Sequence, residues 1–394
     1  MKVKQVPQDF VVEERARVRP TDRGPFALYL LRKEGIGTLE ALRAVRRAWQ
    51  VPGRAVGFGG LKDRHAVTSQ WVTIPRGPRR NLEQATFRLT YEGQFTQPMS
   101  RMLLEGNTFG IRIRDLSDRE ARTLSTRLAD LATHGLPAYF DDQRFGSIRG
   151  DVPFAALLLL RGDAEGAFRA AVASPSREDR GPVKKRKLAL ARAWGHWEDA
   201  LPHLHGTPTR AAVLHLVAHP DDFVGAFAAL DREEKALFTS AWASSVWNRA
   251  LAARVEALVA PDDRLVLPGA SEPLVFAKDP AATASFGTAV LPLPAPNARA
   301  TDPAWQAALE AALAADGLRA DQLAFDPRLG LALRATQRPV LFRPDDLDVK
   351  PPEPDDLNPG RVRLDVRFAL RPGTYATLLL KRATYDMGGA KSIS

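Results

Sequence analysis

The sequence changes its residue pattern at two points, and this change constrains the fold more than any other feature. Residues 1–150 and 333–394 contain short runs in which apolar and polar residues alternate between turn-rich segments, which predicts strands. Residues 151–332 are instead rich in Ala and Leu at helical spacing, with Pro- and Gly-containing loops between the segments. We therefore predict a module of strands and helices built from both chain ends, with a mainly helical domain inserted into it.

The net charge follows the same division. Residues 1–150 carry 26 basic and 16 acidic side chains, a net charge of +10, whereas residues 333–394 carry +3 and residues 151–332 carry −3. A basic module suits the phosphate backbone of a nucleic acid, because each neutralised phosphate releases counterions. We expect a nucleic acid as the partner, with solubility of an Arg-rich chain as the alternative explanation.

The composition excludes several classes of protein. The chain has no cysteine among its 394 residues, which rules out disulfides, thiol nucleophiles and Cys-ligated metal centres. No apolar run approaches the ~18–20 residues that span a bilayer. The first residues, MKVKQVPQDFVVEE, turn acidic where an export signal would be apolar. We expect a cytoplasmic protein that depends little on cofactors and does not enter the membrane.

Several elements can be predicted from periodicity and capping. Ser117 and Glu120 form the pattern of a capping box, and Gly135 suits the end of the helix that follows. The predicted elements are strands in FVVEE and FALYLLRK, a helix at 38–50, strands at 66–74 and 107–116, a helix at 117–135, a loop at 344–360, and a hairpin formed by LDVRFAL and TYATLLLKRA around Pro372-Gly373.

The stretch VGFGGLKDRHAVTSQW (56–71) holds the first candidate site. Three glycines within four positions permit a close backbone approach, and Lys62, Asp63 and Arg64 follow directly before a predicted strand. A carboxylate between two cations is biased towards its ionised, nucleophilic form. The alternative is an ordinary turn whose aspartate forms a surface ion pair.

The stretch GLPAYFDDQRFGSIRG (135–150) holds the second. Tyr139, Phe140 and Phe145 alternate with Arg144 and Arg149, a mixture that can stack on an unpaired base and bind its phosphates. The alternative is that the aromatic rings pack in the core while the arginines are solvated.

Both stretches resemble segments of the TruD family of tRNA pseudouridine synthases. GGLKDRHAVTSQW is similar to the family's AGLKD with its following strand, and PAYFDDQRFG is similar to its PNYFxxQRFG segment. Further similar segments follow in the same order along most of the chain: PQDFVVEE (7–14), GNTFGIRIRDL (106–116), SSVWNRALAAR (244–254), SFGTAVLP (285–292) and LRPGTYATLLLKR (370–382).

The resemblance implies an enzyme that isomerises a uridine of tRNA, at position 13, to pseudouridine, with no metal, no organic cofactor and no obligatory protein partner. It implies an α+β fold: a pseudouridine-synthase catalytic domain with a mixed, mostly antiparallel sheet, formed by 1–150 and 333–394. A mainly helical TruD-type domain at 151–332 would interrupt this catalytic domain.

The resemblance also assigns roles to residues. Asp63 is expected to be the catalytic carboxylate, and Phe140 to stack on the flipped base. Two departures from the family affect the expected site: Ala138 replaces an Asn, and Lys381-Arg382 replaces an Arg-Glu pair. The residues expected to bind substrate or RNA are Lys62, Arg64, Phe140, Gln143, Arg144, Asn248 and Lys381.

Two other classes of function remain open on the residues alone. Asp141 and Asp142 together with Asp63 would suit a metal-dependent RNA nuclease. A non-catalytic RNA-binding protein could use the same basic face. The run KKRK (184–187) is either a contact to the tRNA backbone or a solvated loop.

Overall fold

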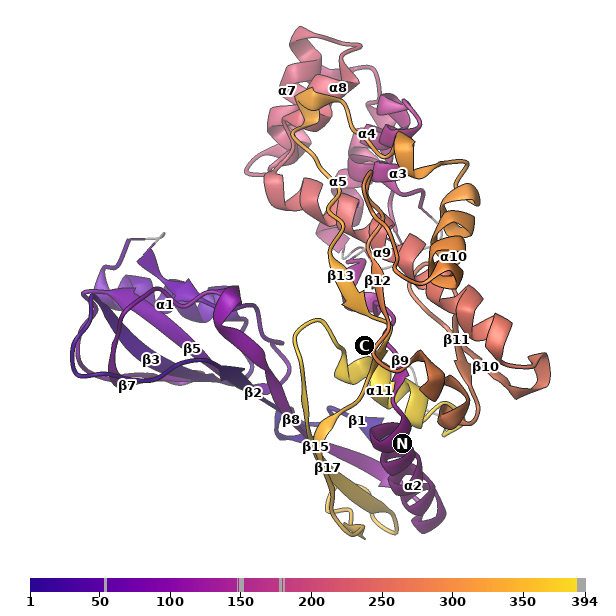
Figure 1. The fold of residues 1–394 in the computed structure, drawn as a ribbon. Coiled ribbons are helices and arrows are strands. Elements are labelled where there is room, and N and C mark those ends of the chain that lie inside the picture. The colour runs from indigo at the N-terminus through magenta and orange to yellow at the C-terminus, as the bar shows by residue number, and fades with distance from the viewer. Residues whose placement is uncertain (53–54, 147, 149–151, 177–178, 180, 388–394) are drawn as a thin grey trace. The chain divides into compact units, whose positions relative to one another are not determined.

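The structure is a computed structural model that describes residues 1–52, 55–146, 148, 152–176, 179 and 181–387. Its contacts divide the chain into two compact units (Figure 1). Unit 1 contains Met1–Gly135 and Arg343–Ser394, and unit 2 contains Leu136–Phe342. Each unit is therefore described separately.

Unit 1 is built on a large mixed sheet with the strand order β15-β17-β8-β2-β5-β3-β7-β6. Strands β2 and β5 run parallel, and the other pairs in this sheet are antiparallel. The strands are β1 (Lys2–Val3), β2 (Phe10–Ala16), β3 (Phe26–Lys33), β4 (Gly57–Phe58), β5 (Val67–Pro75), β6 (Leu82–Gln84), β7 (Phe87–Phe95), β8 (Leu104–Leu116), β15 (Asp345–Val349), β16 (Glu353–Pro354) and β17 (Val362–Leu370).

Two predicted helices of unit 1 are present with the expected signals. Helix α1 (Thr38–Trp49) buries Ala41, Leu42 and Val45 against β3, β5 and β7. Helix α2 (Asp118–His134) begins with the predicted capping box, in which Ser117 Oγ accepts the Glu120 N–H and Glu120 Oε2 accepts the Ser117 N–H. Both helices are confirmed, and so is an α+β fold with a mixed, mostly antiparallel sheet.

Two predictions for the C-terminal region are wrong. The expected second strand of the hairpin is instead helix α11 (Ala376–Ala383), whose Leu378, Leu379 and Leu380 are all buried. A short apolar run that is buried on every side has no period that distinguishes a helix from a strand. The expected loop at 344–360 contains β15 and β16, which pair with β17 and extend the sheet. Charged residues suit such an edge strand because one side faces solvent.

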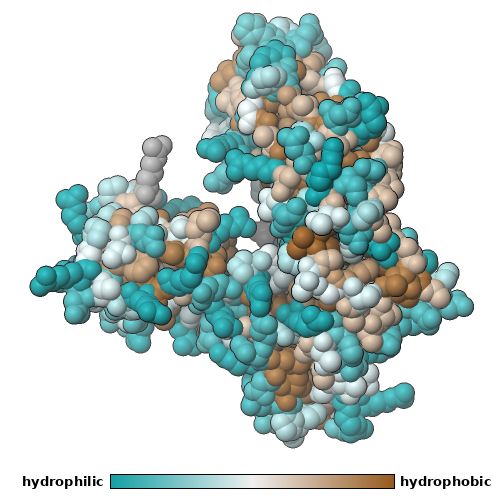
Figure 2. Space-filling model, in the orientation of Figure 1, coloured by the Kyte–Doolittle hydropathy of each residue, from teal (hydrophilic) through white to brown (hydrophobic). Residues whose placement is uncertain are grey.

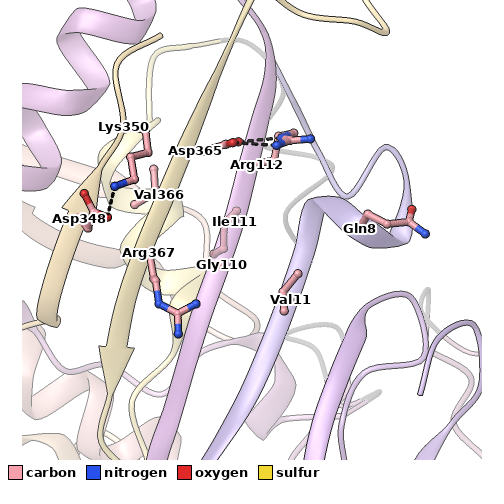
Figure 3. Close-up of a pocket in the computed structure, with 10 residues that line it drawn as sticks. All are labelled: Gln8, Val11, Gly110, Ile111, Arg112, Asp348, Lys350, Asp365, Val366 and Arg367. Carbon is pink, nitrogen blue, oxygen red and sulfur yellow. Dashed lines mark hydrogen bonds and ion pairs between the residues drawn. The ribbon is translucent and has the colours of Figure 1, made fainter. Parts of the chain in front are cut away.

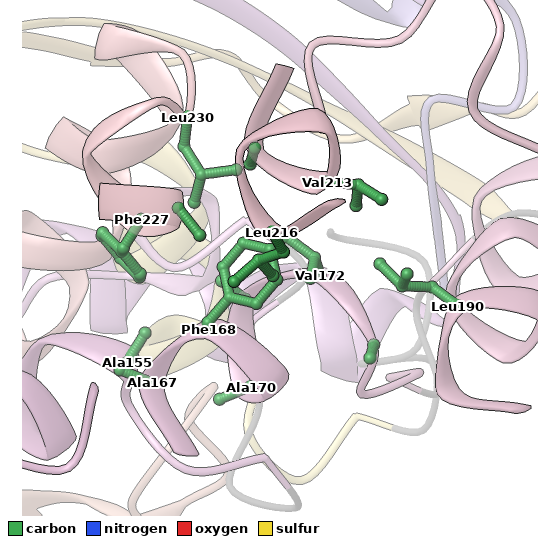
Figure 4. Packing of buried hydrophobic residues seen from close by; sticks show 14 of the residues in the cluster. Ala155, Ala167, Phe168, Ala170, Val172, Leu190, Val213, Leu216, Phe227 and Leu230 are labelled. Carbon is green, nitrogen blue, oxygen red and sulfur yellow. The ribbon is translucent and has the colours of Figure 1, made fainter. Parts of the chain in front are cut away.

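Unit 2 is mainly helical, with three short antiparallel strand pairs. Its core gathers Phe168, Leu216 and Phe227 with alanines from several helices (Figure 4). The elements are β9 (Leu136–Pro137), α3 (Ala155–Leu160), α4 (Ala164–Val172), α5 (Gly181–Arg192), α6 (Trp197–Ala200), α7 (Thr209–Ala218), α8 (Phe223–Ala228), α9 (Arg232–Leu258), β10 (Arg264–Leu267), β11 (Leu274–Ala277), β12 (Val290–Pro292), α10 (Pro303–Ala314), β13 (Gln337–Pro339) and β14 (Leu341–Phe342), and 3-10 turns connect several of them.

The units divide the chain at other positions than the expected 150 and 333. The division follows Gly135 and precedes Arg343, because β9 pairs with β14 and the residues after β9 pack inside unit 2. Tyr139, for example, donates a hydrogen bond from its hydroxyl to Val275 O at 2.6 Å. The described residues of segment 136–148 thus belong to the helical unit, and the assignment of catalytic and inserted domains stays a prediction.

The surface in Figure 2 is largely hydrophilic, with small apolar areas between polar side chains. Within the described part of the chain, no helix has both the length and the apolar character needed to cross a membrane.

Candidate active site

The candidate catalytic residue Asp63 lies on the loop 59–66 between β4 and β5, and two polar side chains anchor this loop. Thr38 Oγ1, at the start of α1, accepts the Lys62 N–H at 2.9 Å and donates to Gln70 Oε1 at 2.9 Å. Gln70 on β5 donates from Nε2 to Gly60 O at 3.0 Å. Because Thr38 and Gln70 are buried, the loop is fixed to the sheet rather than free in solvent.

The Asp63 carboxylate has two well-placed hydrogen-bond donors. Lys4 Nζ lies 2.7 Å from Oδ2, and the His65 backbone N–H donates to Oδ1 at 3.0 Å. The Asp63 side chain is 34% exposed. The carboxylate is therefore oriented by the protein but still open to solvent, as a group that must meet a substrate has to be.

The surroundings of Asp63 favour its ionised form. Partial burial acts to raise the pKa of Asp63, but the hydrogen bonds from Lys4 and His65 and their positive charges outweigh burial and hold this pKa below its usual value. At neutral pH Asp63 is thus a carboxylate that can act as a nucleophile or accept a proton.

A second lysine supports the loop from inside. Lys33, at the end of β3, is almost fully buried and donates from Nζ to Asp63 O at 2.7 Å and to Ile36 O at 2.9 Å. Burial lowers the pKa of Lys33 to about 8, with the charge of Asp63 opposing that effect. Lys33 thus holds the backbone of Asp63, whereas Lys4 holds its carboxylate.

The two sequence neighbours of Asp63 differ in exposure: the Lys62 side chain is buried and the Arg64 side chain is exposed. Lys62 is directed inward: its Nζ lies 2.8 Å from Glu14 Oε2 and 2.7 Å from Asn107 Oδ1, and its side chain is only 7% exposed. Direct binding of RNA by Lys62 would require breaking this buried pair, so the geometry favours a positioning role. Arg64 is exposed and forms an ion pair with Glu40.

Phe140, the predicted stacking residue, is buried in unit 2 and is only 6% exposed. The Arg338 guanidinium lies over its ring at 4.0 Å from the ring centroid, and the Trp247 ring meets it edge-on at 5.4 Å. Arg144 also lies over this ring at 5.2 Å, and its Nε donates to Ser244 Oγ at 3.1 Å. The ring thus packs in the core, as the alternative interpretation expects, but Arg144 is half-buried on the ring rather than solvated.

Asn248 on α9 fixes the backbone of Phe140. Its Oδ1 accepts the Phe140 N–H at 2.8 Å, and its Nδ2 donates to Phe140 O at 2.9 Å. Asn248 is 1% exposed, which makes it a positioning residue rather than a group on an RNA-binding surface. Its importance follows from the resemblance, but its partner could not be predicted from residues that lie 108 positions apart.

The remaining predicted residues occupy three places. Gln143 is exposed on the short turn η4 (Asp142–Arg144), and Lys381 is half-buried on α11 of unit 1. Ala138, where the family has Asn, is buried, and its carbonyl accepts a 2.6 Å hydrogen bond from Arg338 Nη2. Arg149 lies outside the described residues.

Other candidate features do not add a second reactive centre among the described residues. No three His, Asp or Glu side chains of that part of the chain lie close enough together to hold a metal ion. The KKRK run is on helix α5, not in a loop. A pocket of about 310 Å³ lies on the sheet of unit 1. Among the residues that line it, Arg112 pairs with Asp365 and Lys350 pairs with Asp348 (Figure 3).

Sequence reasoning missed the residues that hold Asp63 in place. Lys4, Lys33 and Glu14 come from three separate parts of the N-terminal region, and only the folded sheet brings them to the loop. Two signals were available: Glu14 is the last residue of PQDFVVEE (7–14), which resembles the family, and Lys4 lies three residues before this segment.

The fold is shared with a solved structure. The crystal structure of a Methanosarcina mazei protein described as "Putative tRNA pseudouridine synthase D (TruD)" superposes with a TM-score of 0.72, at 23% identity, covering 98% of this chain and 93% of that one. This similarity assigns the chain to the pseudouridine-synthase D fold.

Sequence comparison then gives the family. The sequence model described as tRNA pseudouridine synthase D (TruD) matches residues 1–383. A Methanococcus maripaludis protein named "Probable tRNA pseudouridine synthase D 1" is 29% identical, over 97% of this chain and 99% of its own length. The tRNA pseudouridine synthase D of Geobacter metallireducens is 30% identical, over 96% and 93%. The chain belongs to the TruD family of tRNA pseudouridine synthases, enzymes that isomerise uridine to pseudouridine.

Proposed function

We propose that this chain isomerises the uridine at position 13 of tRNA to pseudouridine, with Asp63 as the catalytic carboxylate. The observation that carries this proposal is the environment of Asp63: a partly exposed carboxylate, kept ionised by Lys4 and the His65 N–H, on a loop anchored to the sheet. Membership of the family supports the reaction, and the environment of Asp63 supports the choice of this residue as the catalytic carboxylate.

The reaction explains why such a carboxylate is needed. Pseudouridine formation breaks the N-glycosidic bond of a uridine and rejoins the same base to the sugar through carbon. An ionised carboxylate can attack the sugar or the base, or remove a proton from the sugar. Asp63 is suited to each of these roles, because its carboxylate is charged and accessible at neutral pH.

Lys4 and Lys33 contact different parts of Asp63. Lys4 stabilises the charge of the carboxylate and fixes its direction through Oδ2, which leaves a lone pair on Oδ1 beside the His65 N–H. Lys33 holds the Asp63 carbonyl, so that the backbone keeps the same position when substrate binds. Lys62 is placed further back, where it joins the loop to β2 and β8 through Glu14 and Asn107.

Stacking of Phe140 on the flipped base stays a prediction. Its ring is in contact with Arg338 and Trp247, so stacking on a base would require one of these side chains to move. The basic residues at the two chain ends are proposed to bind the tRNA backbone. A cytoplasmic location is proposed on a separate ground, the lack of cysteine in the sequence.

The experiment that tests the proposal compares Asp63→Asn with Asp365→Asn. The two aspartates are equally exposed, at 34% and 35%, and each is paired with a cation, Asp63 with Lys4 and Asp365 with Arg112. Purified proteins are mixed in excess with tRNA, and pseudouridine is mapped by carbodiimide treatment and primer extension. We expect no pseudouridine from Asp63→Asn and normal formation from Asp365→Asn, with unchanged melting curves for Asp63→Asn.

Either of two results would contradict the proposal. Pseudouridine formed by Asp63→Asn would remove Asp63 from the chemistry, since Asn keeps the shape of Asp but cannot act as a nucleophile or base. Cleavage of the tRNA that requires a divalent cation and is abolished by a chelator would instead support the nuclease alternative.

A further inference from the structure

Leu61 is an exposed leucine two residues before Asp63. Its side chain is 65% exposed, on the same loop that carries the candidate catalytic carboxylate. Single exposed leucines are common on protein surfaces and need no explanation by themselves. The position of Leu61 beside Asp63 is what sets it apart.

The loop holds Leu61 in this exposed position. On one side, the Gly60 carbonyl accepts a hydrogen bond from Gln70, and on the other, the Lys62 N–H donates to Thr38. Gly59 lies against the sheet so closely that a Cβ there would be 2.6 Å from Leu104 Cδ2. With the backbone fixed before and after it, Leu61 cannot fold back onto the sheet without breaking these contacts.

The groups around Leu61 are suited to a nucleic acid. Asp63 is partly exposed and pairs with Lys4, and Arg64 is exposed next to it in an ion pair with Glu40. Lys33 is buried beneath the loop and holds the Asp63 carbonyl. A single apolar side chain beside an exposed arginine differs from a protein-docking patch, which would be a continuous apolar area. It is the combination with which proteins insert apolar residues between bases while cations contact phosphates.

We propose that Leu61 enters the base stack of the tRNA at the place left by the target uridine when that base turns out towards Asp63. The inference rests on the proposed function, because a uridine within a stack must be extruded before a carboxylate can reach its glycosidic bond. Extrusion leaves a gap between two apolar base faces. A leucine side chain fills this gap without an unpaired polar group, and therefore stabilises the flipped state.

A fluorescent tRNA tests this without depending on turnover. The transcript carries 2-aminopurine directly 3′ to the target uridine, and its fluorescence rises when stacking with the neighbouring base is lost. Binding is measured with Asp63→Asn, in which the chemistry is blocked, alone and combined with Leu61→Ala, Leu61→Met or Leu357→Ala. Leu357 is a leucine of unit 1 in a different loop, 41% exposed, and serves as the matched control.

We expect a several-fold rise in fluorescence with Asp63→Asn, most of which is lost with Leu61→Ala and kept with Leu61→Met and Leu357→Ala. In the background with an intact Asp63, Leu61→Ala should slow single-turnover pseudouridine formation by roughly tenfold or more, the size expected when support for unstacking is lost. The dissociation constant for tRNA should change less than about threefold, because the phosphate contacts that dominate affinity remain.

Three results would overturn the inference: the same fluorescence rise with Leu61→Ala, no rise with any of the proteins, or an equal loss with Leu357→Ala. A lower melting temperature of Leu61→Ala, seen by circular dichroism, would also overturn it, since an exposed wedge should not support the fold. Pseudouridine formation by Asp63→Asn tests the proposed function separately from the inference on Leu61. If Asp63→Asn alone still forms pseudouridine, Asp63 is not the catalytic residue, while the fluorescence comparison continues to report on Leu61.

Discussion

The loop 59–66 of unit 1 and segment 136–148 of unit 2 use their residues in opposite ways. The loop buries its supports and exposes its reactive group: Thr38 and Gln70 are inside, and the Asp63 carboxylate is accessible. Segment 136–148 instead buries the aromatic residues that looked functional, with Phe140 held by Asn248 and covered by Arg338.

A mixture of aromatic and basic residues therefore does not by itself indicate an exposed binding surface. Arg–aromatic contacts stabilise a core as well as they bind a base, because the cation is attracted to the ring face in both cases. Substitutions in segment 136–148 should therefore lower the free energy of unfolding more than the rate of pseudouridine formation. Substitutions in the loop 59–66 should have the opposite effect.

The largest effect is expected for Phe140→Ala. Removing a buried phenylalanine ring costs about 3–5 kcal/mol of unfolding free energy through lost burial and a cavity, and here the Arg338 and Trp247 contacts are lost as well. Thermal and urea unfolding measure the change, with Phe140→Leu as a control that keeps most of the volume. If Phe140 stacks on the base, Phe140→Ala would instead keep its melting temperature and lose turnover far more than tRNA affinity.

Asn248→Ala is expected to follow with a loss of about 2–3 kcal/mol. The substitution leaves the Phe140 N–H and C=O without their buried partners, and an unsatisfied buried polar group costs about 1–3 kcal/mol. Gln143→Ala, on the exposed turn η4 of the same segment, is the control and should change stability by less than about 0.5 kcal/mol. Equal unfolding curves for the two variants would mean that Asn248 does not hold Phe140.

Lys4→Met tests the loop side of the comparison. Loss of a charge-assisted hydrogen bond of about 1.5–3 kcal/mol should lower turnover by roughly 10- to 100-fold. The free energy of unfolding should change less, by about 0.5–1 kcal/mol, because Met keeps the length of the side chain and loses the contact of Lys4 Nζ with the Phe10 ring. Lys2→Met is the control, since Lys2 is more exposed and pairs with Asp115 and Asn358 instead.

The same variant gives a pH prediction. Lys4 is one of the groups that hold the pKa of Asp63 below its usual value, so its removal raises that pKa. The reactive form is the carboxylate, and a higher pKa means that it is protonated at higher pH. In the profile of kcat/KM against pH, the acidic limb of Lys4→Met should therefore shift to higher pH. An unchanged limb would show that Lys4 does not act on the ionisation of Asp63.

Some elements and contacts could be predicted from the sequence, and others could not. Helices α1 and α2 were predictable because their apolar spacing and, in α2, a capping box are local signals. Helix α11 was not, since Leu378, Leu379 and Leu380 are consecutive and all buried, and a short apolar run of this kind fits a strand as well as a helix. For the candidate site, Asp63 could be identified on its motif, but the contact from Lys4 joins residues 59 positions apart, and only the sheet topology creates it.

The smallest effect is expected for Arg64→Gln, which tests whether the exposed part of the loop contacts tRNA. Arg64 forms an exposed ion pair with Glu40, and such pairs contribute about 0.2–1 kcal/mol, so the melting temperature should change little. If Arg64 contacts a phosphate, its removal should weaken tRNA binding a few-fold and reduce the slope of log affinity against log salt by about one. Filter binding over a salt series measures this, with Arg88→Gln as the control. Arg88 is exposed to a similar degree, 60% against 52% for Arg64, and pairs with Glu83 across the strands β6 and β7. If the slope of log affinity against log salt is the same for Arg64→Gln and for the unmodified protein, Arg64 forms only its ion pair with Glu40. The loop would then expose the Asp63 carboxylate without contributing a phosphate contact through Arg64.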